Sequence, residues 1–168
     1  MTSPRLESRL AGNSPAVLSL FRLVVGLLFL MHGSSTLFDW PVATPVPIEV
    51  GDWPGWWSGL IEFVTGLLVA VGFFTRPAAF LASGTMAVAY FWMHWPGEDG
   101  GAKGFWPMQN GGEPAVFYCF AFLLLVFVGP GSIAVESRMR GRVRGGGRTT
   151  EYAAPAQRPG LMSRFRRR

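Results

Sequence analysis

Cysteine, histidine and charge are all scarce in this chain of 168 residues. The single cysteine, Cys119, excludes an internal disulfide and any zinc or redox motif built from paired cysteines. Two histidines without a cysteine cluster also argue against a metal site built by the protein. Charged residues make up 15% of the chain, whereas soluble domains usually contain about 25%. Such low charge indicates a membrane protein.

Long apolar stretches are what the sequence has instead, since 49% of its residues are hydrophobic. The main stretches cover residues 15–38, 57–74, 77–95 and 113–129. A membrane-spanning helix needs about 20 mostly apolar residues. The first and third stretches reach this length, the second reaches it narrowly, and the fourth reaches it only when its flanking residues are included. None shows the sustained apolar and polar alternation of a strand. The sequence therefore predicts an all-α fold, an integral membrane four-helix bundle.

The bundle is expected to occupy residues 15–136, after a short cytoplasmic segment at 1–14. Residues 137–168 contain ten arginines and few large apolar side chains. This composition cannot bury a core and predicts a disordered basic tail. The tail has the charge to hold anionic lipid, at roughly 1 kcal/mol per basic residue near the surface. It lacks interleaved aromatic residues, so we expect no specific binding to nucleic acid.

Basic residues are unevenly divided between the two sides of the predicted bundle. Arg5, Arg9, Arg76 and the tail share one side, while the two longer loops contain only Lys103. The positive-inside rule therefore predicts a multi-pass protein of the cell (plasma) membrane with both termini in the cytoplasm. The tryptophans then lie on or near the outer face, either as an anchoring belt or as a lid over a pocket: Trp40, Trp53, Trp56, Trp57, Trp92, Trp95 and Trp106.

Arg22 stands inside the first apolar stretch, about 10 Å from its cytoplasmic boundary at the rise of an α-helix. At 100° per residue, Arg22 shares one stripe with residues that suit a packed face: Gly26, Phe29, Gly33 and Thr36. An arginine on a packed face needs a partner. Glu136 is one candidate, and free carbonyl groups at the ends of the second and fourth helices are others. We predict that Arg22 is a structural anchor; a place in a ligand site and simple snorkelling to the headgroups are the alternatives.

Glu62 lies about 7 Å inside the outer boundary of the second stretch, near the expected depth of His32. An ionised carboxylate in hydrocarbon is costly, so Glu62 is expected to have a partner or to be neutral. His32 is the first choice of partner and His94 the second. The pair is either a structural hydrogen bond or a site for protons or a ligand. Asn110 and Glu113 of the second long loop are further candidates for that site, and no catalytic residue is assigned.

Several short motifs in order resemble the DoxX family of small four-helix bacterial membrane proteins. Over residues 16–136 these are Arg22 followed by GLLFLMHG, then EFVTGLLVAVGFFTRPAA, NGGE and GPGSIAVE. The family usually has a lysine three residues after the His-Gly pair, where this chain has Thr36, so a cation beside the outer pocket is in doubt. The last acidic position of the pattern is more often aspartate and is Glu136 here.

The resemblance implies a membrane subunit of a redox system. The family takes its name from a subunit associated with quinone-linked oxidation of sulfur compounds. We therefore expect a quinone or another small apolar ligand near Glu62 and His32, because quinone reduction takes up protons and a carboxylate with an imidazole can supply them. If the chain is catalytic, it is expected to be a subunit of a quinone-linked oxidoreductase. Electrons must then come from a redox partner protein.

Other functions stay open at this stage. A non-catalytic scaffold would recruit redox or stress-defence proteins through the Trp-rich loops and the tail. A small proton-coupled transporter would use Glu62 as a relay, and a single four-helix unit would then need to form a homo-oligomer. A haem held between His32 and His94 is a further alternative.

Overall fold

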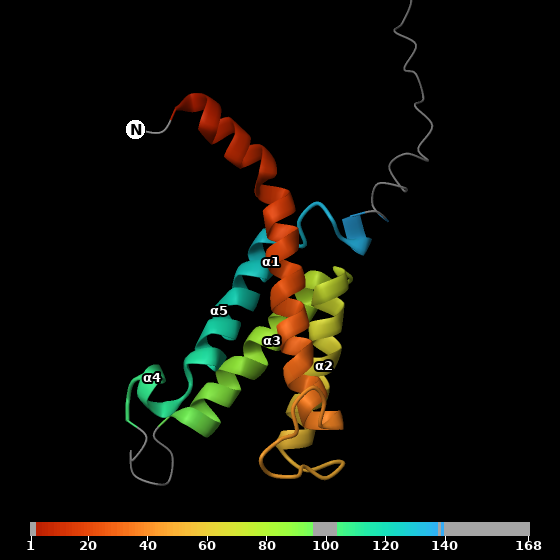
Figure 1. Cartoon of the computed structure of the whole chain (residues 1–168), viewed down its shortest axis with the longest axis vertical. Coiled ribbons are helices and arrows are strands. Elements are labelled where there is room, and N and C mark those ends of the chain that lie inside the picture. Colours follow the sequence, from red (N-terminus) through yellow and green to blue (C-terminus); the bar gives the residue numbers. More distant parts are fainter. Residues whose placement is uncertain (1–2, 96–103, 138, 140–168) are drawn as a thin grey trace, which may run out of the picture.

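The computed structural model describes residues 3–95, 104–137 and 139. All regular structure in them is helical and no strand occurs, which confirms the all-α prediction. Most of the predicted tail, 137–168, lies outside the described residues. In chain order the elements are α1 (Pro4–Phe38), α2 (Gly55–Val71), α3 (Thr75–Ala89), the π-helical turn η1 (Tyr90–His94), α4 (Pro107–Asn110) and α5 (Glu113–Val128) (Figure 1).

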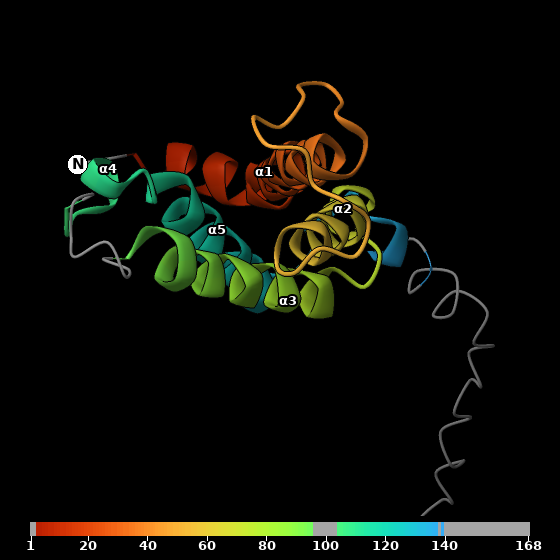
Figure 2. The ribbon, with the colours of Figure 1, turned by 90° about the horizontal axis from the view of Figure 1, so that it is seen from below.

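Two helix pairs build the molecule: α1 packs along α2, and α3 packs along α5 (Figures 1 and 2). The pairs are joined where α2 contacts α3, whereas α1 and α5 meet over a smaller area. The turn between α2 and α3 is tight because Gly72 and Phe74 both adopt left-handed conformations, with φ of 74° and 48°. Such residues end one helix and redirect the chain at once. As the short link predicts, α2 and α3 are antiparallel neighbours.

The two ends of the molecule differ in composition. The loop end is formed by residues 39–54, the start of α2, η1 and α4, and the terminus end by the start of α1 and residues 129–139 (Figure 1). The seven tryptophans belong to the loop end. There the ring of Trp53 packs on Trp92 with centroids 6.1 Å apart, and Trp56 packs on Trp57 at 5.1 Å. Ring contacts thus connect residues 39–54 with η1.

Helix α1 begins at Pro4, well before its predicted start at Pro15. Residues 4–14 include the good helix formers Leu, Arg, Glu and Ala, and proline is well tolerated in a first turn. Pro15 therefore lies inside the helix rather than at its beginning. The axis bends near it, as proline usually causes, and residues 4–14 leave the bundle (Figure 1). The other predicted helix bounds are close to those observed.

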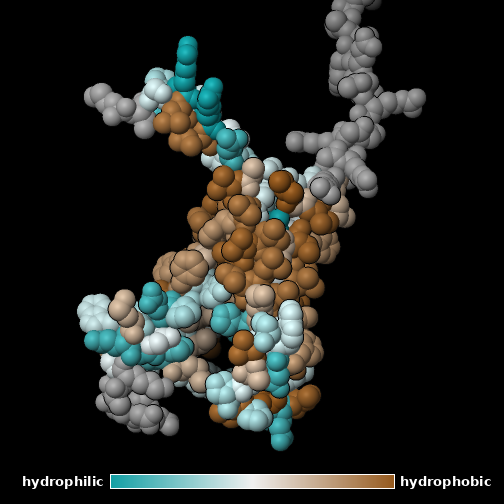
Figure 3. Space-filling view, in the orientation of Figure 1, coloured by the Kyte–Doolittle hydropathy of each residue, from teal (hydrophilic) through white to brown (hydrophobic). Residues whose placement is uncertain are grey.

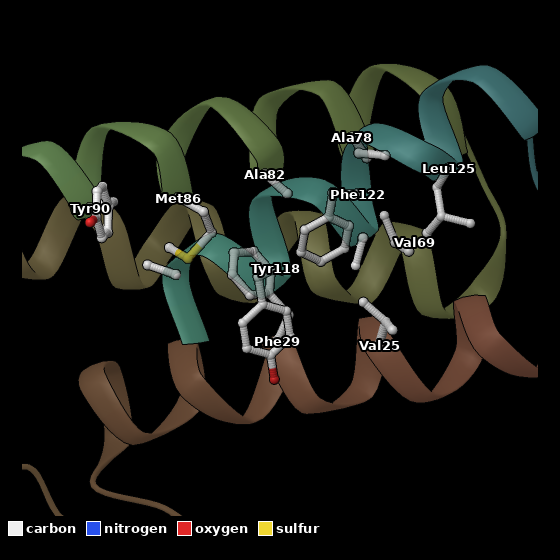
Figure 4. Packing of buried hydrophobic residues seen from close by; sticks show 13 residues of the cluster. Val25, Phe29, Val69, Ala78, Ala82, Met86, Tyr90, Tyr118, Phe122 and Leu125 are labelled. Carbon is white, nitrogen blue, oxygen red and sulfur yellow. The ribbon is translucent and has the colours of Figure 1, made fainter. Parts of the chain in front are cut away.

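The core lies between the two helix pairs (Figure 4). Phe29 of α1, Val69 of α2, and Phe122 and Leu125 of α5 are almost completely buried. The ring of Phe29 packs edge-on against Phe122, with centroids 4.7 Å apart. Outside this core, large apolar side chains are exposed along the middle of the molecule, between more polar ends (Figure 3). A soluble monomer rarely exposes so large an apolar surface.

The helices differ in how much of a bilayer their lengths could cross. Among the described residues, α1 is the one helix both long and apolar enough to cross a bilayer, while α2 and α5 are apolar but shorter. The 17 residues of α2 cover about 25 Å, against about 30 Å for a typical hydrocarbon core. Helix α3 continues into η1 and reaches His94. Four membrane-spanning helices therefore stay a prediction.

Glycines bring α1 and α2 into backbone contact. A Cβ atom added to Gly26 would lie 2.6 Å from the backbone nitrogen of Ala70, and one added to Gly66 would lie 2.6 Å from that of Leu30. Both distances are far below van der Waals contact. Because the opposing atoms are backbone atoms, neither helix can accommodate a side chain by a local rotamer change. The α1–α2 interface therefore needs glycine at both positions.

Gly66→Ala is expected to lower the free energy of unfolding by about 1–3 kcal/mol, the usual cost of overpacking. Gly84→Ala on α3 is the matched control, because a Cβ at Gly84 would meet nothing within 4 Å. Both proteins are purified in detergent, heated, and assayed for the folded fraction by size-exclusion chromatography. A Gly66→Ala midpoint equal to that of the wild type would contradict the close contact.

Candidate functional site

Arg22 is buried in α1, with 3% of its surface exposed, and donates hydrogen bonds to four backbone carbonyl groups. Its Nε donates to Pro130 at 2.9 Å and its Nη2 to Ile133 at 2.7 Å. Its Nη1 donates to Val69 and, at 2.6 Å, to Ala70. One side chain of α1 thus holds two other segments of the chain.

The chemistry of the guanidinium explains this geometry. Val69 and Ala70 lie in the last turn of α2, where carbonyl groups lose their usual N–H donor four residues later. Pro130 and Ile133 follow the end of α5. Five N–H groups in a rigid planar fork can serve both segments at once. These carbonyl groups are the alternative partners that the sequence indicates beside Glu136, and the geometry is that of a structural anchor.

Ser19, one turn before Arg22, fixes the same segment to α1. Its hydroxyl donates to the carbonyl of Pro15 at 2.9 Å and accepts the N–H of Ile133 at 2.9 Å. The backbone N–H of Glu136 donates to the carbonyl of Gly72 at 3.1 Å. Glu136 is therefore placed at the end of α2, beside the region that Arg22 holds. The chain after α5 folds back over both helices of the first pair.

Glu62 of α2 and His32 of α1 have a common neighbour, Tyr118 of α5. The rings of His32 and Tyr118 lie edge to face with centroids 5.6 Å apart. Glu62 lies within electrostatic range of the Tyr118 hydroxyl. The buried Tyr118 side chain extends from α5 towards α1, beside Phe29 (Figure 4). In the described part of the chain, no hydrogen bond or ion pair joins Glu62 directly to His32. The direct pair expected from the sequence is therefore not formed, and each of the two side chains instead neighbours Tyr118.

The three side chains come from three helices and both helix pairs. His32 is exposed, Glu62 is half-buried and Tyr118 is buried, so the group extends from the surface into the core. In the space-filling view the surface is hollowed at the loop end, between residues 39–54 on one side and α4 on the other (Figure 3). A carboxyl, a phenol and an imidazole together can donate and accept protons at an oxygen-bearing ligand.

Asn110 and His94 belong to a second polar group, with Tyr90. The Asn110 carbonyl oxygen lies 3.1 Å from Nδ1 of His94, and the Asn110 side-chain nitrogen makes a long 3.5 Å bond to the Tyr90 hydroxyl. The Tyr90 and His94 rings stack with centroids 6.4 Å apart. Met86 lies between Tyr90 and Tyr118 in the core (Figure 4). The structure thus divides the predicted site residues into two groups at the loop end.

Glu113 is exposed in the first turn of α5, where a carboxylate interacts favourably with the helix dipole. That position accounts for Glu113 without a ligand. Cys119 is half-buried, and its carbonyl accepts a hydrogen bond from Ser83 at 2.9 Å. Among the residues that the structure describes, no three His, Cys, Asp or Glu side chains gather as metal ligands.

An open groove of about 570 Å³ lies between α2 and α3 on the outside of the bundle. Its walls are mostly apolar, with Trp53, Trp57 and Trp92 towards the loop end and Gly84 and Thr85 on α3. A groove of this volume is in the range of small-molecule sites. Sequence analysis missed it because residues far apart in the chain form it.

Tyr118 and Tyr90 are the other residues that sequence analysis missed. Both stand in long apolar stretches, where they resemble ordinary core aromatics. Their hydroxyl groups could have distinguished them from ordinary core aromatics, because a buried tyrosine hydroxyl normally needs a hydrogen-bond partner. Such a partner implies that polar groups from other helices reach the same place.

Known proteins resemble this chain. The DoxX family model matches residues 17–95, which cover most of α1 and all of α2, α3 and η1. An uncharacterized protein of Haemophilus influenzae is 38% identical over 125 residues, which make up 74% of this chain and 91% of the relative. No solved structure matches the chain.

Two further relatives are membrane proteins. An uncharacterized membrane protein of Mycobacterium tuberculosis is 28% identical over 153 residues, or 83% of this chain and 89% of the relative. The inner membrane protein YphA of Escherichia coli is 28% identical over 134 residues, or 74% of this chain and 91% of the relative. Their location agrees with the low charge and the exposed apolar surface of this chain.

Arg22→Lys is expected to lower the free energy of unfolding by at least about 1.5–3 kcal/mol, the usual contribution of one hydrogen bond to a charged group. The lysine keeps the charge, but its compact ammonium cannot serve both segments. Arg76→Lys is the control, because Arg76 is exposed at the same end of the molecule. Thermal midpoints and folded yields in detergent measure both. Wild-type stability of Arg22→Lys would contradict the anchor.

Proposed function

The chain belongs to the DoxX family, and we propose that it is a multi-pass subunit of the cell membrane that binds a quinone or a related small apolar ligand near the loop end. In this proposal α1, α2, α3 with η1, and α5 cross the bilayer. The termini lie in the cytoplasm and the loop end faces outside. The apolar surface exposed along the middle of the molecule supports this placement (Figure 3). Arg5, Arg9 and Arg76 near the terminus end support it too.

The observation that carries the proposal is the ring contact of His32 with Tyr118 near the loop end, with Glu62 within electrostatic range of the same tyrosine. Polar and ionisable groups inside a membrane are costly, and they usually mark functional sites. Reduction of a quinone adds two electrons and two protons and converts both carbonyl groups into hydroxyl groups. A carboxyl, an imidazole and a phenol are suitable donors and acceptors for those protons.

In this proposal the protein's own residues bind and orient the ring and exchange protons with it. Tyr118 would hold the ring from the core, while the exposed His32 would contact it from the surface of the bundle. The electrons come from a separate redox protein of the same system. The second group of Asn110, His94 and Tyr90 is bonded within itself and has no part in binding the ring in this proposal.

A scaffold is the second candidate function. Trp40, Trp53 and Trp106 at the loop end are 63%, 70% and 63% exposed. Exposed tryptophans are typical of protein interfaces as well as of membrane surfaces. In this alternative the loop end recruits redox proteins, and no small molecule binds among the helices.

Glu62→Gln is expected to weaken quinone binding at least tenfold, which corresponds to about 1.4 kcal/mol. Binding of a short-chain quinone to the detergent-solubilised protein is measured by quenching of tryptophan fluorescence. Gly84→Leu is the matched variant, because it fills the groove between α2 and α3 and leaves the Glu62 group intact.

The two variants separate the outcomes. Loss of binding in Glu62→Gln alone supports the proposed site. Loss of quinone binding in Gly84→Leu alone would show that the ligand occupies the groove between α2 and α3, and would contradict the proposed site. Absence of binding to the wild type favours the scaffold, which is then tested by recruitment of redox proteins to the loop end.

Tyr118→Phe keeps the ring contacts with Phe29 and Phe122, so folding is expected to be nearly unchanged. Quinone affinity should fall, because one hydrogen-bond donor is lost. Tyr90→Phe is the control for the second polar group and should bind like the wild type. The opposite ranking of the two variants in the same fluorescence assay would place the ligand at Asn110 and His94 instead.

A further inference from the structure

Residues 4–14 of α1 form a helical segment outside the packed bundle. Helix α1 contains Pro15 and bends near it, and the segment before the bend points away from the other helices (Figure 1). Every residue from 4 to 14 is exposed. The segment therefore lies outside the buried core of the bundle, although its helix continues directly into the apolar run that begins with Ala16 and Val17.

The segment is amphipathic. Leu6 and Leu10 are one turn apart and are 46% and 59% exposed. Arg5 and Arg9 are also one turn apart, so the arginine pair faces about 100° away from the leucine pair around the helix. Glu7 stands on the side opposite the arginine pair at this period. Apolar and polar side chains gather on separate sides of the segment (Figure 3).

This pattern fits a membrane surface. A helix lying in the interface buries an apolar face at the acyl boundary and directs basic side chains to the headgroups. The segment is tethered to that surface, because α1 is the helix long and apolar enough to cross the bilayer. Charge complementarity then selects the lipid, since two arginines attract anionic headgroups.

We propose that residues 4–14 lie along the bilayer surface, with Leu6 and Leu10 inserted among the acyl chains and Arg5 and Arg9 bound to anionic lipid headgroups. The bend near Pro15 turns α1 from a spanning into a surface direction. This proposal rests on the membrane placement of the proposed function and is independent of quinone binding. The arginine pair would thereby fix the depth at which α1 enters the membrane.

The test uses the full chain with Cys119 replaced by alanine and a single nitroxide-labelled cysteine. Position 10 reports the leucine face, and Ser8→Cys is the matched control, because Ser8 lies about 160° away around the helix. The protein is reconstituted in vesicles that contain phosphatidylglycerol. The label at position 10 is expected to collide with oxygen more than with a water-soluble nickel complex, and the label at position 8 the reverse.

The arginine contribution is tested in the same assay. Arg5→Gln with Arg9→Gln is expected to raise nickel access at position 10 at least twofold in anionic vesicles. The protein with native arginines should show the same rise in nickel access at position 10 in vesicles of pure phosphatidylcholine. No effect of either change would overturn the headgroup contact.

Two further outcomes would overturn the proposal as a whole. Equal nickel access at positions 8 and 10 in anionic vesicles would show a segment in water. Shielding of position 10 from both reagents would show a protein contact instead of lipid. Because no quinone enters this assay, failure of the quinone-binding measurement leaves its result unaffected.

Discussion

The hydrogen bonds of Arg22 are the interaction on which the terminus end depends. One guanidinium donates to carbonyl groups from the end of α2 and from the segment after α5. Arg22 is buried, so water cannot replace these bonds, and the cation and the four carbonyl groups must satisfy one another. Arg22 therefore couples three parts of the chain: α1, the end of α2 and the segment after α5. None of the three can shift without breaking hydrogen bonds to Arg22.

Sequence indicates those features that depend on one helix at a time. The stripe of Arg22, Gly26, Phe29, Gly33 and Thr36 follows from 100° per residue. The structure buries the first four residues and half-buries Thr36. The helices of the bundle follow from the lengths of apolar runs, and the tight link between α2 and α3 follows from its shortness. The free carbonyl groups near Arg22 follow from the fact that every helix end leaves carbonyl groups without donors.

What sequence does not indicate depends on how the helix pairs are set against each other. Tyr118 stands with Glu62 and His32 because α5 faces α1 at that height, and Asn110 faces Tyr90 because α4 folds back over η1. The groove between α2 and α3 has the same origin. The early start of α1 was missed for a different reason, because Pro15 resembles the first residue of a helix and the preceding residues carry charge.

The smaller contact between α1 and α5 has a mechanical consequence. Glycines lock α1 to α2, and Arg22 ties this pair to the chain after α5 at the terminus end. At the loop end the pairs are instead joined by ring contacts, between Trp53 and Trp92 and between His32 and Tyr118. Glu62 and His32 belong to the first pair, while Tyr118 belongs to the second. The candidate site thus lies where the two pairs are held by aromatic contacts, and the end fixed by a buried cation lies away from it.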